Sequence, residues 1–436
     1  MDLSTVSAQE FQANWKPRFF TIFAGQALSL FGSSLVQFAL VWYLTQQTGS
    51  ATILATATLI AMLPQIVLGP FVGALVDRWN RRIVMMVADG AIALATLVLA
   101  GLFWLGLAQV WHIYAILFLR SLGGAFHWPA MQASTSLMVP KEQLARVAGM
   151  QQTLQGLVSI VAPPTGAVLI SVLPTQGVLA IDVVTALLAI LPLFFIAIPQ
   201  PVRQQTADGQ PQTSYWQDMR EGLAYVARWP GLLAILIMAT LINFLLTPTG
   251  SLMPLLVTKY FGLGALELGL TDSLWGIGMI VGGVALSTWG GFKRRIATSM
   301  MGIAGIGLGI LLVGLAPAKW FWLALAGMSL TGLMQVMANG PLHAVLQAVV
   351  KPEMQGRVMS LIGSAATAMT PLSLAVAGPV SDLIGIRTWY IFAGAISLLM
   401  GLSGFFIPAV MNVENNHSGQ ESAASTPPGL ATEPAD

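Results

Sequence analysis

The chain contains no cysteine and few charged residues: among its 436 residues, Asp, Glu, Lys and Arg together make up 8%. Soluble globular proteins carry about 25% charged residues, so this composition excludes a soluble enzyme, a nucleic-acid-binding protein and a disordered chain. The absence of cysteine excludes a disulfide framework, a thiolate metal site and a cysteine nucleophile. The net charge of +2 is too small to indicate an anionic partner. We therefore expect neither nucleic acid nor a metal ion as a ligand.

Motifs that bind nucleotides are also missing from the sequence. No Gly-Lys-Ser or Gly-Lys-Thr occurs, so the chain lacks the phosphate-binding loop of ATPases. Gly305, Gly307 and Gly309 match part of a dinucleotide-binding motif, but they lie in an apolar run with no strand before it, and we interpret them as helix-packing surface. The sequence therefore predicts no nucleotide, no cofactor and no enzymatic activity. An ion gradient, here a proton gradient, is the expected source of energy.

Long apolar runs account for most of what is present. Hydrophobic residues make up 56% of the chain, and the mean hydropathy is +0.77. A transmembrane helix requires roughly 20 mainly apolar residues. The chain divides into twelve such runs, near residues 19–44, 52–76, 83–107, 113–137, 149–173, 178–198, 231–257, 267–290, 297–316, 320–345, 358–380 and 388–411. We therefore predict an all-α membrane protein with twelve transmembrane helices in a lipid bilayer.

Lysine and arginine are distributed unevenly over the segments between these runs. If the chain starts in the cytoplasm, fifteen of the nineteen fall in cytoplasmic segments, and Arg120 lies inside a predicted helix. Only Lys259, Lys319 and Arg387 fall on the other side. Because positively charged loops stay in the cytoplasm, we expect both termini to be cytoplasmic.

Two halves of the chain repeat each other. Asp77–Arg82 after the second run aligns with Gly290–Arg295 after the eighth at an offset of 213, and Pro129 is matched by Pro341 at an offset of 212. Weak internal symmetry of this kind is typical of transporters that are built from two similar bundles. The sequence therefore predicts two six-helix bundles in the same orientation.

Five segments follow from the spans and the repeat. They are a cytoplasmic N-terminal segment (1–18), an N-terminal six-helix bundle (19–198), a cytoplasmic linker (199–230), a C-terminal six-helix bundle (231–411) and a disordered cytoplasmic tail (412–436). The linker ends in an amphipathic stretch, 215–229. This stretch is either an interfacial helix that coordinates the two halves or a tether that lies on the lipid headgroups.

The loop after the second predicted helix reads Gly73-Ala-Leu-Val-Asp77-Arg78-Trp-Asn-Arg81-Arg82. It resembles the signature loop of the major facilitator superfamily. Further stretches are similar to bacterial macrolide exporters of the drug/proton antiporter group in that superfamily, among them Arg120-Ser-Leu-Gly-Gly-Ala-Phe-His127-Trp-Pro129-Ala130 and Ala180-Ile-Asp182-Val183. The resemblance implies the major facilitator fold, alternating access, and proton-coupled export of macrolide-like drugs. It also implies a bacterial inner membrane and a monomer.

The resemblance further implies a role for the loop as a conformational latch. In this interpretation Asp77 pairs with the start of the eleventh helix, and an aspartate at the positive end of a helix dipole gains about 0.3 to 1 kcal/mol. The residues of the latch are Gly73, Asp77, Arg78, Arg81 and Arg82. The alternative is that the loop serves only to hold this segment in the cytoplasm.

Charged residues inside the predicted spans are candidates for proton coupling. A charge inside a span costs on the order of 2.5 to 3.5 kcal/mol, so such residues usually face a cavity and mark function. Arg120 is the clearest case, and Asp182 is its best expected partner; the alternative for Arg120 is a side chain that reaches the membrane surface. Asp89 and Asp272 are the other embedded acids. Their structural alternatives are an ion pair of Asp89 with Arg78 or Arg82, and an interfacial position for Asp272.

Polar residues on several spans are candidates for a substrate cavity. Gln26, Ser29, Ser33 and Gln37 share one helix face and either line the cavity or join helices by hydrogen bonds. The remaining candidates are Phe126, His127, Trp128, Gln151, Gln155, Asn243, Gln335 and Asn339. Together they suggest a large, mostly apolar cavity with few polar groups, as drug-binding sites usually are. For His127, packing without a role in binding is the alternative.

The sequence thus predicts a proton-coupled exporter of amphipathic small molecules, with macrolide-like drugs as the first candidate. A siderophore exporter and a lysophospholipid transporter on the same fold are alternatives. An anionic cargo would require several cationic residues in the cavity, and the spans offer only Arg120. A membrane receptor or enzyme that retained the scaffold without transport is the alternative from another functional class.

Overall fold

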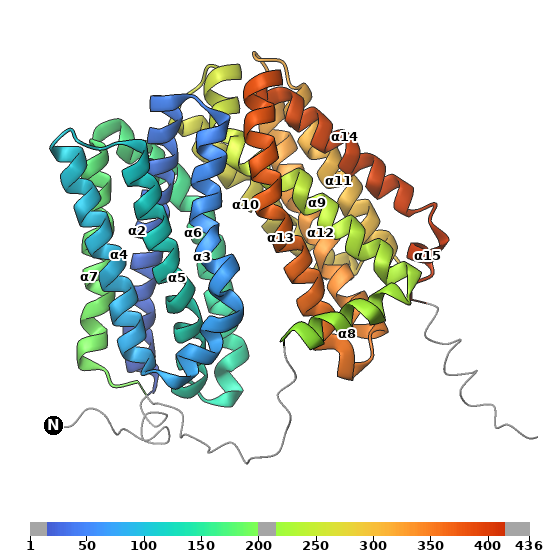
Figure 1. The fold of residues 1–436 in the computed structure, drawn as a ribbon, viewed down its shortest axis with the longest axis horizontal. Helices are drawn as coiled ribbons and strands as arrows, with labels where there is room; N and C mark the ends of the chain where they lie inside the picture. Colours follow the sequence, from blue (N-terminus) through green and yellow to red (C-terminus); the bar gives the residue numbers. More distant parts are fainter. Residues whose placement is uncertain (1–14, 199–214, 415–436) are drawn as a thin grey trace, which may run out of the picture.

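The chain forms two bundles of long helices. The computed structural model describes residues 15–198 and 215–414, and within these ranges the regular structure is helical throughout. The N-terminal bundle contains α2 (Trp15–Thr48), α3 (Ala51–Arg78), α4 (Arg81–Trp104), α5 (Val110–Met138), α6 (Leu144–Val172) and α7 (Thr175–Phe195). The C-terminal bundle contains α9 (Pro230–Leu255), α10 (Ala265–Trp289), α11 (Arg295–Leu315), α12 (Phe321–Val349), α13 (Pro352–Ile384) and α14 (Ile386–Gly404). Figure 1 shows the two bundles side by side.

The helices begin and end close to the predicted spans because polar residues interrupt the apolar runs. The Asn80 side chain, for example, accepts a hydrogen bond from the backbone N–H of Arg82 and caps the start of α4. Eleven described helices are long and apolar enough to cross a membrane. The exception among the twelve long ones is α5, which carries Arg120 together with His112 and His127. The membrane crossing of α5, and with it the total of twelve spans, therefore stays a prediction.

The last predicted span is too long at its C-terminal end. Instead of continuing to residue 411, α14 ends at Gly404, and the short helix α15 (Pro408–Met411) follows. Proline disfavours helical backbone at the residue before it, so Pro408 separates the two helices. The predicted segments 1–14, 199–214 and 415–436, which include most of the linker and the tail expected to be disordered, lie outside the described residues.

The same helix pairs pack in both bundles. In the N-terminal bundle α2 contacts α6 and α7, α5 contacts α3 and α4, and α4 contacts α7. The C-terminal bundle has the five equivalent contacts: α9 with α13 and α14, α12 with α10 and α11, and α11 with α14. The predicted repeat is confirmed by this correspondence, and α5 and α12 even have the same length of 29 residues.

The two bundles meet along two equivalent seams, α3 with α13 and α6 with α10. At the first seam Asp382, near the end of α13, accepts hydrogen bonds from the backbone N–H groups of Ala51 (2.8 Å) and Thr52 (3.0 Å). The hydroxyls of Ser50 (3.0 Å) and Thr52 (2.7 Å) donate to the same carboxylate. A side chain of one bundle thus caps the N-terminus of a helix in the other.

The second seam depends on close packing. A Cβ atom at Gly269 of α10 would lie 2.9 Å from backbone atoms of Pro163 and Pro164 in α6, so glycine is needed for this approach. The Ser273 hydroxyl of α10 donates a hydrogen bond of 2.6 Å to the Ile160 carbonyl of α6. The seams are therefore symmetric in position and different in chemistry.

The amphipathic stretch of the linker forms helix α8 (Tyr215–Ala227), which packs against α13 and α9 below the C-terminal bundle (Figure 1). Val226 is fully buried there, and Glu221 forms an ion pair of 2.7 Å with Arg357 of α13. The helix is therefore attached to the C-terminal bundle. A tether that only lies on the lipid headgroups would not account for these contacts.

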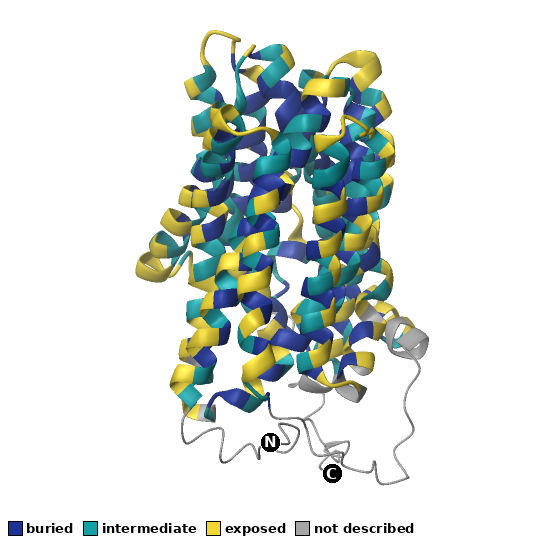
Figure 2. Ribbon diagram, turned by 90° about the vertical axis from the view of Figure 1, so that its left-hand side faces the viewer, coloured by how far each residue is buried: buried dark blue, intermediate teal, exposed yellow. Residues whose placement is uncertain are grey.

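Large apolar side chains cover the outer surface of the described helices. Val87, Leu94, Phe195 and Leu399 are each more than half exposed, and Figure 2 shows exposed residues along the whole outer length of the bundles. Water does not favour an apolar surface of this extent. The surface is suited to lipid tails, as the composition predicts.

Candidate functional site

A cavity of about 1240 Å³ lies between the bundles. Side chains of α2 to α6 line it from the N-terminal bundle, and side chains of α9 and α10 line it from the C-terminal bundle. A second lobe of about 640 Å³ lies among α9 to α12. Thr247, Gly250 and Asp272 line both, so the two lobes are adjacent.

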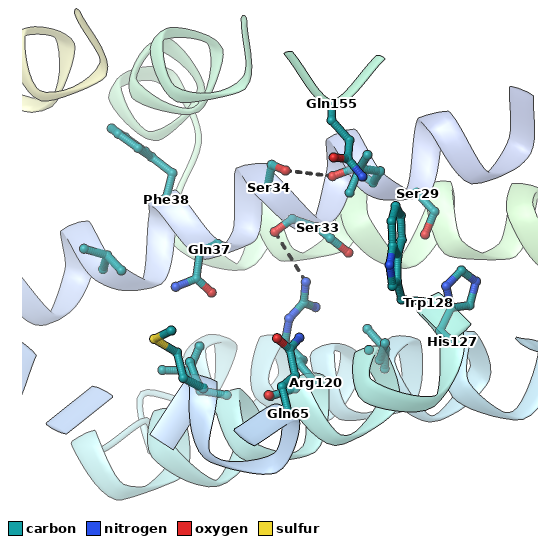
Figure 3. Close-up of a pocket in the computed structure, with 18 of the residues that line it drawn as sticks. Ser29, Ser33, Ser34, Gln37, Phe38, Gln65, Arg120, His127, Trp128 and Gln155 are labelled. Carbon is teal, nitrogen blue, oxygen red and sulfur yellow. Dashed lines mark hydrogen bonds between the residues drawn. The ribbon is translucent and has the colours of Figure 1, made fainter. Parts of the chain in front are cut away.

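The four polar residues that were predicted to share one face of α2, here called the polar stripe, face this cavity. Gln26, Ser29, Ser33 and Gln37 all line it, and Figure 3 shows Ser29, Ser33 and Gln37 on the opposite side from Arg120 and His127 of α5. Two members of the stripe also join helices, because Gln26 donates to Asp89 (3.1 Å) and the Ser33 hydroxyl donates to Asp182 (3.0 Å). Both alternatives for the stripe are therefore realised at once.

The other predicted cavity residues divide between the two lobes, with one exception. His127, Trp128, Gln151 and Gln155 line the main cavity, whereas Asn243, Gln335 and Asn339 line the second lobe. The prediction was wrong for Phe126, which does not line either lobe and instead stacks on Trp79 with the ring centroids 6.0 Å apart. Because successive residues of a helix point about 100° apart, Phe126 points roughly 150° away from the direction midway between His127 and Trp128, so it faces away from the cavity.

Arg120 and Asp182 form a buried ion pair beside the cavity. The distance between Arg120 Nη1 and Asp182 Oδ2 is 2.5 Å, and the Asp182 side chain is fully buried. The Thr96 hydroxyl accepts from Arg120 (2.5 Å) and donates to Asp182 (3.2 Å). Arg120 also donates to the Ser33 carbonyl at 3.4 Å. Four helices, α2, α4, α5 and α7, thus converge on one charge pair, and the predicted partner of Arg120 is confirmed.

Asp89 of α4 has partners other than the predicted ones. Its carboxylate accepts from Gln26 and lies 3.4 Å from His127 Nε2, at ion-pair distance when the imidazole is protonated. Arg82, which was one expected partner, instead donates to the carbonyls of Leu193 and of Phe194 (2.7 Å) at the end of α7. The negative end of the α7 dipole attracts this guanidinium, which leaves Asp89 free to face the cavity.

The residues of the predicted latch are only partly described. Arg81 donates to the Ala133 carbonyl of α5 at 2.8 Å, so Arg81 and Arg82 both stabilise contacts within the N-terminal bundle. Gly73 is exposed near the end of α3. The side chains of Asp77 and Arg78 lie outside the described part of the structure, so the pairing of Asp77 with α13 stays a prediction.

Three contributors were not predicted from the sequence. Thr96 bridges the buried ion pair, Gln65 of α3 lines the main cavity, and Asp382 joins the bundles. A threonine in an apolar run has no distinguishing signal, because its hydroxyl can bond to its own helix. Gln65 could have been found as a polar residue inside a span.

The arrangement is suited to binding a small molecule. Its lining is mainly apolar, with a few amides, hydroxyls and charged groups that would orient a ligand. In residues 15–198 and 215–414, no three His, Asp or Glu side chains come together in a way that would hold a metal ion.

Comparisons with known proteins agree with this geometry. The family model of the Major Facilitator Superfamily matches residues 22–369 and, in an overlapping match, 235–432. Macrolide efflux protein A of Streptococcus pyogenes is 36% identical over 390 residues, which cover 89% of this chain and 95% of that protein. The protein of the same name from Enterococcus faecalis is 36% identical over 327 residues, covering 75% of this chain and all of that one.

More distant relatives share the fold. Multidrug efflux pump Tap of Mycolicibacterium fortuitum is 26% identical, with 88% of this chain and 94% of that protein covered. Among solved structures, a bacterial homologue of the human lysosomal transporter Spinster superposes with a TM-score of 0.66 at 12% identity, covering 93% of this chain and 98% of that one. At this identity the structural likeness concerns the fold alone.

Proposed function

We propose that this chain, which belongs to the Major Facilitator Superfamily, exports amphipathic small molecules of the macrolide type in exchange for protons. Relatives that match most of its length include a macrolide efflux protein and a multidrug efflux pump, so an efflux transporter and not an enzyme is the supported class. The observation that carries the proposal is the cavity of about 1240 Å³ between two equivalent bundles. A site at the interface of two repeats is where alternating access requires the cargo to bind.

Alternating access would occur by rocking of one bundle against the other. The seams α3–α13 and α6–α10 are equivalent under exchange of the bundles, which supports a pseudo-symmetric motion about the cavity. In this scheme the Asp382 cap holds one end closed, and Asp77, next to Arg78, would hold the other end through the start of α13. The chain would act as a monomer in the inner membrane, with both termini in the cytoplasm.

Proton coupling would be carried by Arg120 and Asp182. A proton on Asp182 removes the charge that holds Arg120, so protonation and the position of the guanidinium are linked. Ser33 and Gln37 of the same region line the cavity, which provides a route by which bound cargo disturbs the pair. Asp89, which faces His127, is the second candidate for carrying a proton.

The alternatives are weaker on the same observations. A siderophore or lysophospholipid with negative groups would need cationic partners, whereas Arg120 is the one arginine among the residues of the two lobes and is already paired with Asp182. A receptor or enzyme on this scaffold would not need a buried charge pair that four helices share.

Drug susceptibility of an efflux-deficient bacterial strain tests the proposal. The strain expresses this chain and is challenged with macrolides, with other amphipathic drugs, and by iron limitation, each with and without a protonophore uncoupler. The expected result is a several-fold rise in macrolide resistance that the uncoupler abolishes. Resistance that survives the uncoupler would contradict proton coupling, and good expression without any drug phenotype would contradict the cargo class.

A further inference from the structure

Asp272 lies where the two lobes of the cavity meet. It lines both of them, together with Thr247 and Gly250 of α9. It is the eighth residue of α10, as Asp182 is the eighth residue of α7. At a helical rise of 1.5 Å per residue, each acid lies about 10 Å along its helix. The N-terminal bundle thus contributes Asp182, whose charge is balanced by Arg120. The C-terminal bundle contributes Asp272.

The other charged groups of the site already have partners. Arg120 is paired with Asp182, and Asp89 accepts from Gln26 and faces His127. Asp272, by contrast, has no hydrogen-bond or ion-pair partner among the residues that the structure describes. A carboxylate in a mainly apolar space is poorly satisfied by the protein alone, so this position favours a cation from outside.

An aromatic residue lies one turn further along the same helix and lines the same lobe as Asp272. Trp275, three residues further along α10, lines the second lobe, and residues three apart share one helix face. Indole is the best aromatic face for binding a cation. A carboxylate and an indole on one helix face can bind an alkylated ammonium ion together. The carboxylate attracts the positive charge, and the face of the indole ring makes a cation–π contact with it.

We propose that Asp272, with Trp275, is the anchor for a protonated tertiary amine of the cargo. The inference rests on the proposed export function and makes it more specific: the cargo is a cationic amphiphile, with its apolar body in the main cavity and its ammonium group at Asp272. Asn243, Gln335 and Asn339 of the second lobe would bind polar groups next to the amine. His343, the other titratable group of that lobe, lines its wall.

Binding of matched ligands to the full-length protein in lipid nanodiscs tests the anchor. The probes are erythromycin, which has a dimethylamino group, its N-oxide, in which the N–O group has no net charge, and tetraphenylphosphonium, an unrelated lipophilic cation. We expect Asp272→Asn to bind erythromycin about tenfold more weakly than the wild type, a loss of about 1.4 kcal/mol. Its affinity for the N-oxide should be unchanged, and its affinity for tetraphenylphosphonium should fall.

Glu267→Gln is the matched control, because it removes an acid from the same helix while an amide can still cap Gly264. It should retain the preference for the amine. Equal affinity of the wild type for amine and N-oxide, or a preference that persists in Asp272→Asn, would overturn the anchor. If the wild type binds tetraphenylphosphonium through Asp272 but binds neither macrolide, the anchor stands and the proposed macrolide cargo fails. Absence of binding of all three probes would overturn both.

Discussion

Arg120 lies inside α5, where a charged side chain costs on the order of 2.5 to 3.5 kcal/mol to insert. Asp182, Thr96 and the Ser33 carbonyl offset this cost by taking up its donors. Removing one partner of a buried ion pair typically costs about 3 to 5 kcal/mol, because the other charge is left unpaired. The pair therefore matters for folding as well as for the proposed proton coupling, and an experiment has to separate these contributions.

A double-mutant cycle separates them. Asp182→Asn alone leaves Arg120 unpaired, so we expect a markedly lower melting temperature and no gradient-driven efflux. In the double variant Arg120→Gln/Asp182→Asn both charges are gone, and thermal stability should recover to a large part. Efflux driven by a proton gradient in proteoliposomes should remain absent, while binding of cargo stays measurable. Efflux by the double variant at the wild-type rate would show that the pair does not couple the proton.

The residues of the charge pair were predictable, but its surroundings were not. Two opposite charges inside apolar spans have few ways to avoid the cost of burial, so their pairing follows from the sequence. The contribution of Thr96 depends on where α4 faces relative to α5 and α7, which a single sequence does not specify. Phe126 was wrong as a cavity residue, because it points to the side of α5 away from the direction that His127 and Trp128 share.

At the scale of elements, the two seams differ in how easily they separate. The α6–α10 seam depends on the close approach at Gly269, whereas the α3–α13 seam has the Asp382 cap at its end. This carboxylate is exposed, so solvent screens its charge. A helix cap contributes about 1 kcal/mol, enough to shift an open–closed equilibrium of this end by a factor of roughly five.

Asp382→Asn should therefore open this end more often. The absence of native cysteine allows a clean readout: Ala55, which is 2% exposed and lies next to Gly378 in the seam, is replaced by cysteine and labelled with a maleimide in nanodiscs. We expect labelling of Ala55→Cys to be several-fold faster in the Asp382→Asn background.

Two controls accompany this measurement. Ser50→Ala removes one of the four donors to Asp382 and should accelerate labelling less. Cysteine at the exposed Gln46 should react at the same rate in every background. Equal labelling of Ala55→Cys with and without Asp382 would show that the cap does not hold the seam closed.

Element boundaries followed from composition, whereas contacts between elements did not. Charged and turn-forming residues interrupt the apolar runs, so most helices begin and end within a few residues of the prediction. The end of α14 was missed because hydropathy continues through Phe405 and Phe406, past the point where Pro408 breaks the helix. The contact of Asp382 with Thr52 joins residues 330 apart in the chain, and no local pattern indicates it.

For the whole molecule, the exchange symmetry of the bundles implies an even number of crossings. The contacts of α5 with α3 and α4 match those of α12 with α10 and α11, and α12 qualifies as a span whereas α5 does not. Arg120 of α5 meets Asp182 inside the bundle, and Ser121, Ser134 and Thr135 are buried, so these polar groups are not exposed to lipid. We therefore expect α5 to cross the membrane despite its lower hydropathy.

Reporter fusions decide this point and the orientation together. Alkaline phosphatase, active outside the cytoplasm, and green fluorescent protein, fluorescent inside it, are fused in turn after Leu107, Pro140, Pro317 and Val413. We expect phosphatase activity after Leu107 and Pro317, and fluorescence after Pro140 and Val413, because positive loops are retained inside. The same reporter active after both Leu107 and Pro140 would show that α5 does not cross. Inversion of all four results would preserve twelve spans and place the termini outside, against the distribution of lysine and arginine.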